Sequence, residues 1–334
     1  MKAEKPQPET DKEPSAPHPR DTFAFVGHDA EEAALAEGLA SGRMHHAWLL
    51  AGPKGLGKAT LAYRFARIAL GAKRNGPRPF DVDAEDVMAR RISARAHPDL
   101  FVLRRGLNDR GKPRREIAVD DARKLGGFFA LAPAEGGMRV AIVDCVDDLN
   151  RNAANALLKT LEEPPARSVL LLVCHAPGAA LATIRSRCRR LALRALSDED
   201  VQKALSGEGE AALLRLAKGR PGRAIALKAQ GLVTAGVELE DALKAFARGE
   251  ARAIVMSLYD RLEGEPFERF AALMELAGEW ARAAGVERGS EAWAEAWSAL
   301  ETLRSEAEDL DMDPRHALAR AIGVLERAAS VARR

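Results

Sequence analysis

The sequence contains few cysteines and almost no excess charge, and both shortages restrict what the chain can be. Only Cys145, Cys174 and Cys188 occur in 334 residues, and no two of them form a close Cys-x-x-Cys pair. With no signal peptide in front, this argues against a disulfide framework, and a reducing cytoplasm is expected. Lysine and arginine number 51 against 49 acidic residues, a formal net charge of +2. That balance argues against a protein held to DNA by bulk charge.

Long apolar runs and aromatic residues are also scarce. No apolar run reaches the length of a membrane span, so no contact with a membrane is expected. Aromatic residues make up 5% of the chain, so the core must rely on alanine, leucine, valine and isoleucine. The length predicts two or three domains. Residues 1–22 are rich in proline and charge and have little to bury, which predicts a disordered tail.

Five short apolar runs alternate with amphipathic segments between residues 23 and 194. Continuous runs of this length are typical of strands that are buried on both faces of a parallel sheet. The helix after the first run is expected to stop at Gly71, and the helix after the third near Glu163, before Pro164. The runs are residues 48–51, 100–103, 140–143, 169–173 and 191–193. This alternation predicts an α/β domain over residues 23–194.

The last 140 residues show no strand pattern and are predicted to be helical. Residues 195–234 are expected to form a small helical lid, with a break at residues 219–222. Residues 235–334 are expected to form a larger all-helical domain. Its helices should be interrupted near residues 264–266, near Gly285 and near residues 313–314.

A glycine-rich segment directly after the first apolar run matches the core of the Walker A phosphate-binding loop. Gly52, Gly55 and Gly57 would let backbone amides turn toward phosphate oxygens, and Lys58 would add a positive charge. The strand before the loop and the amphipathic helix after it are the context that this motif requires. The alternative is a glycine-rich turn that binds nothing.

Two positions depart from a working ATPase site. The residue after the lysine should carry a hydroxyl that ligates Mg²⁺, but it is Ala59, and Thr60 lies about 100° around the helix. The third run ends in Asp144, as a magnesium-binding strand should, yet Cys145 stands where a catalytic glutamate is needed. Each loss should cost orders of magnitude in hydrolysis. Binding of ATP or ADP through the loop stays open.

Several motifs resemble those of the clamp-loader subunits of bacterial DNA polymerase III. The clearest are the stretch at residues 152–165, which ends Leu161-Glu162-Glu163-Pro164-Pro165, and the triplet Ser186-Arg187-Cys188 that follows it. The others are Phe25-Val26-Gly27, His45-His46-Ala47 and His97-Pro98-Asp99. The resemblance covers residues 23 to about 230. It covers the last helical segment by length and pattern alone.

The resemblance implies an α/β P-loop fold of the AAA+ type with a parallel sheet, a small helical lid and an all-α C-terminal collar. The family includes the motor subunits gamma and tau and the delta-prime branch, which does not hydrolyse ATP. Ala59 and Cys145 place this sequence with delta-prime. The implied function is a scaffold with no ATPase activity of its own in a DNA polymerase holoenzyme. The implied partners are gamma/tau and delta, with the sliding clamp and primer-template DNA reached through the complex.

The resemblance also suggests roles for single residues. Arg187, flanked by Ser186 and Cys188, would be an arginine finger that completes the site of a neighbouring subunit. On composition alone, Arg187 is instead one of five arginines on a solvated basic edge at residues 185–194. Arg223 stands at the place of the sensor-2 arginine that touches nucleotide. The family's four-cysteine zinc module has no counterpart, because residues 71–96 hold no cysteine, so no zinc is expected.

Two rival functions remain at this point. A motor-type clamp-loader ATPase that tolerates Ala59 and Cys145 would turn over ATP alone and lose that activity in Lys58→Ala. A P-loop kinase or DNA-repair ATPase is the second rival, and the clamp-loader motifs count against it.

Overall fold

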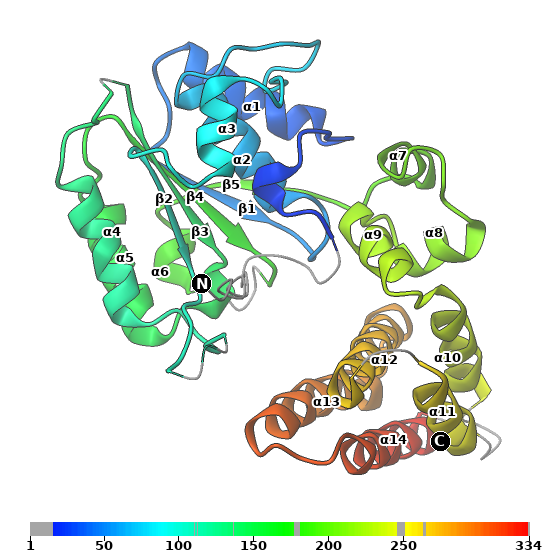
Figure 1. The fold of residues 1–334 in the computed structure, drawn as a ribbon. Helices are drawn as coiled ribbons and strands as arrows, with labels where there is room; N and C mark the ends of the chain where they lie inside the picture. The colour runs from blue at the N-terminus through cyan, green and yellow to red at the C-terminus, as the bar shows by residue number, and fades with distance from the viewer. Residues whose placement is uncertain are drawn as a thin grey trace, which may run out of the picture. The chain divides into compact units, whose positions relative to one another are not determined.

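The computed structural model describes residues 16–332 apart from residues 110, 112, 136, 177–180, 246–250 and 263–264. The chain divides into two compact units, Met1–Ala226 and Leu227–Arg334 (Figure 1). The first unit carries the sheet and the predicted lid, and the second is helical. The predicted fold class, an α/β domain with a parallel sheet followed by helices, is confirmed.

All five apolar runs form strands of one parallel sheet. The strands are β1 (Ala47–Ala51), β2 (Leu100–Arg104), β3 (Arg139–Asp144), β4 (Ser168–Cys174) and β5 (Arg189–Ala192). Their order across the sheet is β2-β3-β4-β1-β5, and every pairing is parallel. All strands therefore end at one edge, the carboxyl edge, and begin at the other, the amino edge.

Helices cover both faces of the sheet, as Figure 1 shows. One face carries α1 (Asp29–Ala40), α2 (Lys58–Ala69) and α3 (Val87–Ser93), and the other α4 (Val119–Phe129), α5 (Arg151–Glu162) and α6 (Ala182–Arg185). Strand β1 shows why its run is continuously apolar. Trp48 and Leu50 lie in the core under α2, whereas Leu49 lies in the core under α5.

The helices end where local chemistry stops them. Helix α2 ends at Ala69, and Gly71 follows with a φ of +103°, so the expected stop is confirmed. Helix α5 ends at Glu162, with Glu163 as its C-cap, because Pro164 disfavours helical geometry at the residue before it.

Three short helices follow the sheet: α7 (Asp198–Ala204), α8 (Ala211–Ala217) and α9 (Pro221–Ala229). The expected break lies between α8 and α9, where Lys218 and Gly219 are left-handed and Pro221 starts the next helix. The first unit ends at Ala226, inside α9, whereas the predicted lid ran to residue 234. The domain limits remain predictions.

The second unit contains long helices packed against one another: α10 (Val233–Ala245), α11 (Ala251–Arg261), α12 (Pro266–Arg288), α13 (Glu291–Asp309) and α14 (Pro314–Val331). The break expected near Gly285 lies four residues further on, because α12 continues to Arg288 and ends at a left-handed Gly289. Gly285 serves a close approach instead, since a Cβ there would lie 3.0 Å from the backbone N of Ala294 in α13.

The other two predicted interruptions of this unit are present. Helix α12 starts at Pro266 with a capping box made by Glu265 and Glu268. Gly264, the first residue of that expected break, lies outside the described residues. Helix α14 starts at Pro314, where Asp313 accepts a hydrogen bond from the His316 N–H at 2.9 Å. No helix in the described part of the chain is long and apolar enough to cross a membrane.

The predicted tail differs from the structure at its end. Residues 1–15 lie outside the described residues, but Pro19–Asp21 forms a 3₁₀ helix (η1) that contacts α2 and α3. The Arg20 Nε donates to the Ser93 carbonyl at 3.0 Å, and the buried Arg67 donates to the Arg20 carbonyl. These backbone contacts hold a polar segment that has little apolar surface of its own.

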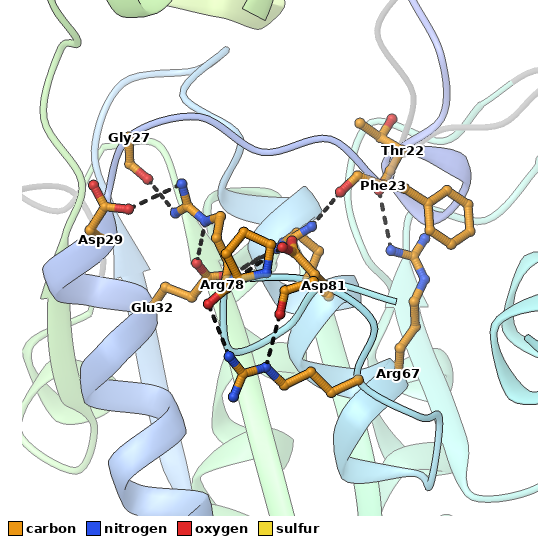
Figure 2. A network of polar contacts seen from close by, with 12 residues as sticks. Thr22, Phe23, Gly27, Asp29, Glu32, Arg67, Arg78 and Asp81 are labelled. Carbon is orange, nitrogen blue, oxygen red and sulfur yellow. Dashed lines mark hydrogen bonds and ion pairs between the residues drawn. The ribbon is translucent and has the colours of Figure 1, made fainter. Parts of the chain in front are cut away.

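A buried ionic cluster fixes the loop between α2 and α3 (Figure 2). The Glu32 carboxylate accepts from Arg64 Nη2 at 3.0 Å and from Arg78 Nε at 2.6 Å. Arg64 also binds Asp81 at 2.7 Å, and Arg78 donates to the Gly27 carbonyl at 2.7 Å. Glu32 and Arg64 are each 1% exposed. Charge pairing therefore ties α1, α2 and this cysteine-free loop together.

Replacing Glu32 by glutamine tests the cluster. The change removes the buried carboxylate that Arg64 and Arg78 share, and leaves Arg64 with Asp81 and Arg78 with the exposed Asp29. It should lower the free energy of unfolding by about 2 kcal/mol. Urea denaturation of the full chain measures it. The control Glu37→Gln alters an exposed carboxylate of the same helix and should change stability by less than about 0.5 kcal/mol. Equal effects of the two variants would contradict a structural role for the cluster.

Candidate functional site

The glycine-rich loop at residues 52–58 joins β1 to α2 at the carboxyl edge of the sheet. Gly55 and Gly57 have φ values of +86° and +84°, which other residues adopt only with strain. Gly52 also lies in the loop, where its N–H donates to the Cys174 carbonyl at 3.2 Å. The structure thus brings together the predicted loop residues in the strand–loop–helix geometry of a phosphate-binding loop.

Lys58 points into its own loop. Its Nζ donates to the carbonyls of Gly52 and Pro53, both at 2.6 Å, and the residue is only 3% exposed. Burial lowers the pKa of Lys58 to about 8, although the carboxylates of Asp144 and Asp147 act in the opposite direction. The loop carbonyls therefore accept the Lys58 hydrogens that a bound phosphate would otherwise accept.

Helix α9 packs directly on the loop. The Gly222 N–H donates to the Gly55 carbonyl at 2.8 Å, and a Cβ on Gly222 would lie 3.1 Å from the Cα of Gly55. A Cβ on Gly55 would in turn lie 2.9 Å from the backbone N of Arg223. Arg223, predicted as a nucleotide contact, is thus next to the loop and is buried.

The two positions that depart from a working ATPase site offer neither the hydroxyl nor the carboxylate that hydrolysis needs. Ala59 has no hydroxyl, and Thr60 is half-buried one position further along α2. Asp144 ends β3, as predicted. The next residue, Cys145, is buried, and burial together with Asp148, Asp147 and Asp144 raises the pKa of its thiol. A protonated thiol here cannot act as a general base.

The two acidic residues beyond Cys145 are engaged elsewhere. The Asp147 carboxylate accepts backbone N–H bonds from His175 at 2.6 Å and Ala176 at 2.9 Å. It therefore ties the loop after β3 to the end of β4. Asp148 pairs with Arg105 at 3.2 Å, and burial raises the pKa of its carboxyl group. No sequence pattern indicates this structural role of Asp147, because its partners are backbone amides distant in the chain.

His175 directly follows β4, at the carboxyl edge of the sheet. Burial and the nearby charge of Lys58 lower its pKa to about 3, so the ring is neutral at pH 7. Its Nδ1 is buried and has no hydrogen-bond partner among the described residues. A neutral imidazole beside Lys58 could hydrogen-bond a phosphate but would add no positive charge.

The triplet at residues 186–188 stands apart from the loop, just before β5. Ser186 Oγ donates to the Thr183 carbonyl at 3.1 Å, and Cys188 packs against the core under α5. Arg187 lies between them and is 35% exposed. Because β1 and β5 are parallel neighbours, the length of β5, roughly 13 Å, separates Arg187 at the amino edge from the loop at the carboxyl edge.

Two further motifs have structural roles that sequence reasoning did not identify. Buried Asp99 accepts N–H bonds from Ala134 at 2.8 Å and Glu135 at 3.1 Å, and lies 3.3 Å from Arg139 Nε. His46 Nε2 lies 3.1 Å from the Leu161 carbonyl, so it attaches the end of α5 to the start of β1. The motif spacing indicated that these residues matter, but not which atoms they bind.

Comparison with known proteins identifies a family that this chain matches. A family described as "DNA polymerase III, delta subunit" matches residues 27–197, about half of the chain. The chain belongs to this family. The match runs from just before α1 through the sheet, the loop and the arginine triplet to the first residues of the predicted lid.

Several subunits of DNA polymerase III share about a third of the aligned residues with this chain. The DNA polymerase III subunit delta' of Pseudomonas aeruginosa is 35% identical over 62% of this chain and 63% of its own length. The subunit delta' of Escherichia coli is 34% identical over 58% of this chain and 57% of its length. The chain thus spans less than two thirds of these relatives. The subunit tau of Salmonella typhimurium is 36% identical over 55% of this chain and 27% of its length.

Solved structures give weaker likenesses. A DNA polymerase III gamma subunit-related protein of Thermotoga maritima aligns with a TM-score of 0.47 and 16% identity, covering 89% of this chain and 99% of its own. The RuvB Holliday junction branch migration motor of the same organism aligns with a TM-score of 0.42 and 17% identity, covering 89% and 87%. Because both TM-scores are below 0.5, the description of the fold rests on the strand order and helices given above.

The depressed pKa of Lys58 predicts a pH-dependent stability. Below pH 8 both folded and unfolded chains hold the proton, so the cost of burying the ammonium is present in full. Between pH 8 and 10.5 only the folded chain has lost the proton, so wild-type stability rises with pH. Relative to Lys58→Met, the wild type should gain about 2 kcal/mol of unfolding free energy between pH 7 and pH 10.

Denaturation of both proteins at a series of pH values measures this gain. The variant Lys73→Met, at an exposed lysine, measured beside them accounts for the general effect of losing an amine. A constant difference between wild type and Lys58→Met across this range would mean that Lys58 is not desolvated.

Proposed function

We propose that the chain is a delta-prime-type subunit of a bacterial DNA polymerase III clamp loader, which does not hydrolyse ATP and supplies Arg187 to the ATPase site of a neighbouring subunit. The observation that carries the proposal is the position of Arg187. It is half-exposed at the amino edge of the sheet, whereas this chain's own loop lies at the carboxyl edge. An arginine that far from its own loop cannot complete this chain's own site, so a nucleotide that it touched would belong to another subunit.

The state of the loop supports the non-hydrolysing half of the proposal. Ala59 offers no magnesium ligand and the Cys145 thiol no base, while Asp147 is bound to backbone amides. To bind a nucleotide, Lys58 would have to release the loop carbonyls and donate to phosphate oxygens instead. The hydrogen bond from Gly222 to Gly55 also keeps α9 packed against the loop. A bound ATP or ADP would therefore be held without turnover. The proposed function requires no zinc.

The partners follow from the family. In the proposed complex the chain would contact gamma or tau and delta, and helices α10 to α14 would form part of a collar. The sliding clamp and primer-template DNA would be reached through the complex, in the cytoplasm. The rival motor-type ATPase requires a magnesium ligand and a base that the described site does not offer.

Reconstitution of a loader with its motor subunits, clamp and primed DNA tests the proposal. Wild-type chain alone should show no Mg²⁺-dependent ATP turnover. Arg187→Ala should leave assembly intact but lower turnover by the complex, because an arginine finger contributes about a thousandfold or more at the site it serves.

The matched control is Arg190→Ala, which removes an exposed arginine from the same basic stretch. Full turnover in this variant would show that the complex needs Arg187 itself and not merely positive charge along residues 185–194. Turnover by the isolated chain that disappears in Lys58→Ala would identify a motor ATPase instead.

A further inference from the structure

Arg187 does not project freely into solvent. Its Nη2 lies 2.7 Å from Glu162 Oε1, and its Nη1 donates to the Thr183 carbonyl at 2.9 Å. The two contacts come from different elements, since Glu162 is the last residue of α5 and Thr183 lies in α6. The guanidinium is therefore held at two points.

The carboxylate that holds Arg187 is itself on a fixed support. The preceding residue, Leu161, is buried in the core, and its carbonyl lies 3.1 Å from His46 Nε2. On the arginine side, Cys188 packs against the same core and Ser186 closes the last turn of α6. Two motifs separated by about 25 residues in the chain thus meet at one ion pair.

The ion pair is too exposed to matter much for stability. The side chains of Arg187 and Glu162 are 35% and 50% exposed, and pairs in such positions contribute little to folding. They can nevertheless restrict the rotamers of a long side chain. Nη1 donates to the Thr183 carbonyl and, at 3.4 Å, to Ser186 Oγ, while Nη2 contacts Glu162, so Nε–H and one Nη2 hydrogen remain to bind an anion.

We propose that Glu162 is the positioning residue for Arg187: it holds the guanidinium in one orientation before the phosphate of a neighbouring subunit arrives. The inference rests on the function proposed above for Arg187. Glu162 touches no nucleotide and acts only through the arginine. Without it, the side chain must be ordered at the moment of reaction, which lowers the rate but not the affinity of the neighbour for ATP.

The adjacent Glu163 provides a matched control. Its side chain is exposed, and within the described residues it forms no ion pair, although its backbone N–H donates to the Lys159 carbonyl. Glu162→Gln and Glu163→Gln therefore remove the same charge from neighbouring positions of the same motif, and only the first breaks the contact with Arg187.

The experiment uses the reconstituted loader and measures the Arg187-dependent turnover, defined as wild-type turnover minus that of Arg187→Ala. Glu162→Gln should lower the kcat of this part by about three- to tenfold with an unchanged KM for ATP. Glu163→Gln should match wild type, and Glu162→Asp should recover part of the loss. In the Arg187→Ala background, Glu162→Gln should have no further effect.

The outcomes separate this inference from the proposed function. If Arg187→Ala leaves turnover unchanged, the finger itself is refuted. If Arg187→Ala lowers turnover but Glu162→Gln equals wild type, or raises it, only the positioning role is refuted. An equal loss in Glu162→Gln and Glu163→Gln, or a further loss in the Arg187→Ala background, would show a general charge or folding effect. Gel filtration and thermal denaturation of each variant check assembly and folding.

Discussion

The parallel direction of the five strands is the constraint on which both functional regions depend. Parallel strands all end at one edge of the sheet, so the glycine loop after β1 and the acidic end of β3 meet there. The same geometry places whatever precedes a strand at the opposite edge, which is where Arg187 enters β5. The sheet thus holds the glycine loop and Arg187 at opposite edges.

At the carboxyl edge, the residues of the glycine loop and its neighbours are bound to one another within the protein. Lys58 satisfies carbonyls of its own loop, Asp147 caps amides at the end of β4, and Gly55 contacts the first turn of α9. These contacts give the loop residues a reason to persist without catalysis. A phosphate-loop sequence therefore predicts the geometry of the loop. It predicts hydrolysis only where the hydroxyl that ligates magnesium and the catalytic base are also present.

The strands and the loop could be predicted because their signals are local. Buried parallel strands need continuous apolar runs, and a tight phosphate loop needs glycine at residues such as Gly55. Contacts between distant residues left no such signal. The contact between Glu162 and Arg187 could not be predicted, although both residues belong to motifs described above. Sequence spacing does not show which edge of the sheet each residue reaches. Gly285 marks the break only approximately, because a helical glycine can serve close packing as well as a break.

The backbone contact between Gly222 and Gly55 makes the small helical segment part of the sheet's own cooperative unit. Neither residue has a side chain that could shift, so the segment cannot tilt slightly and keep the contact; it is either docked or detached. Exchange of the Gly222 amide hydrogen with solvent would then require detachment. One amide proton thus reports how often this subunit opens, and it does so without any nucleotide being added.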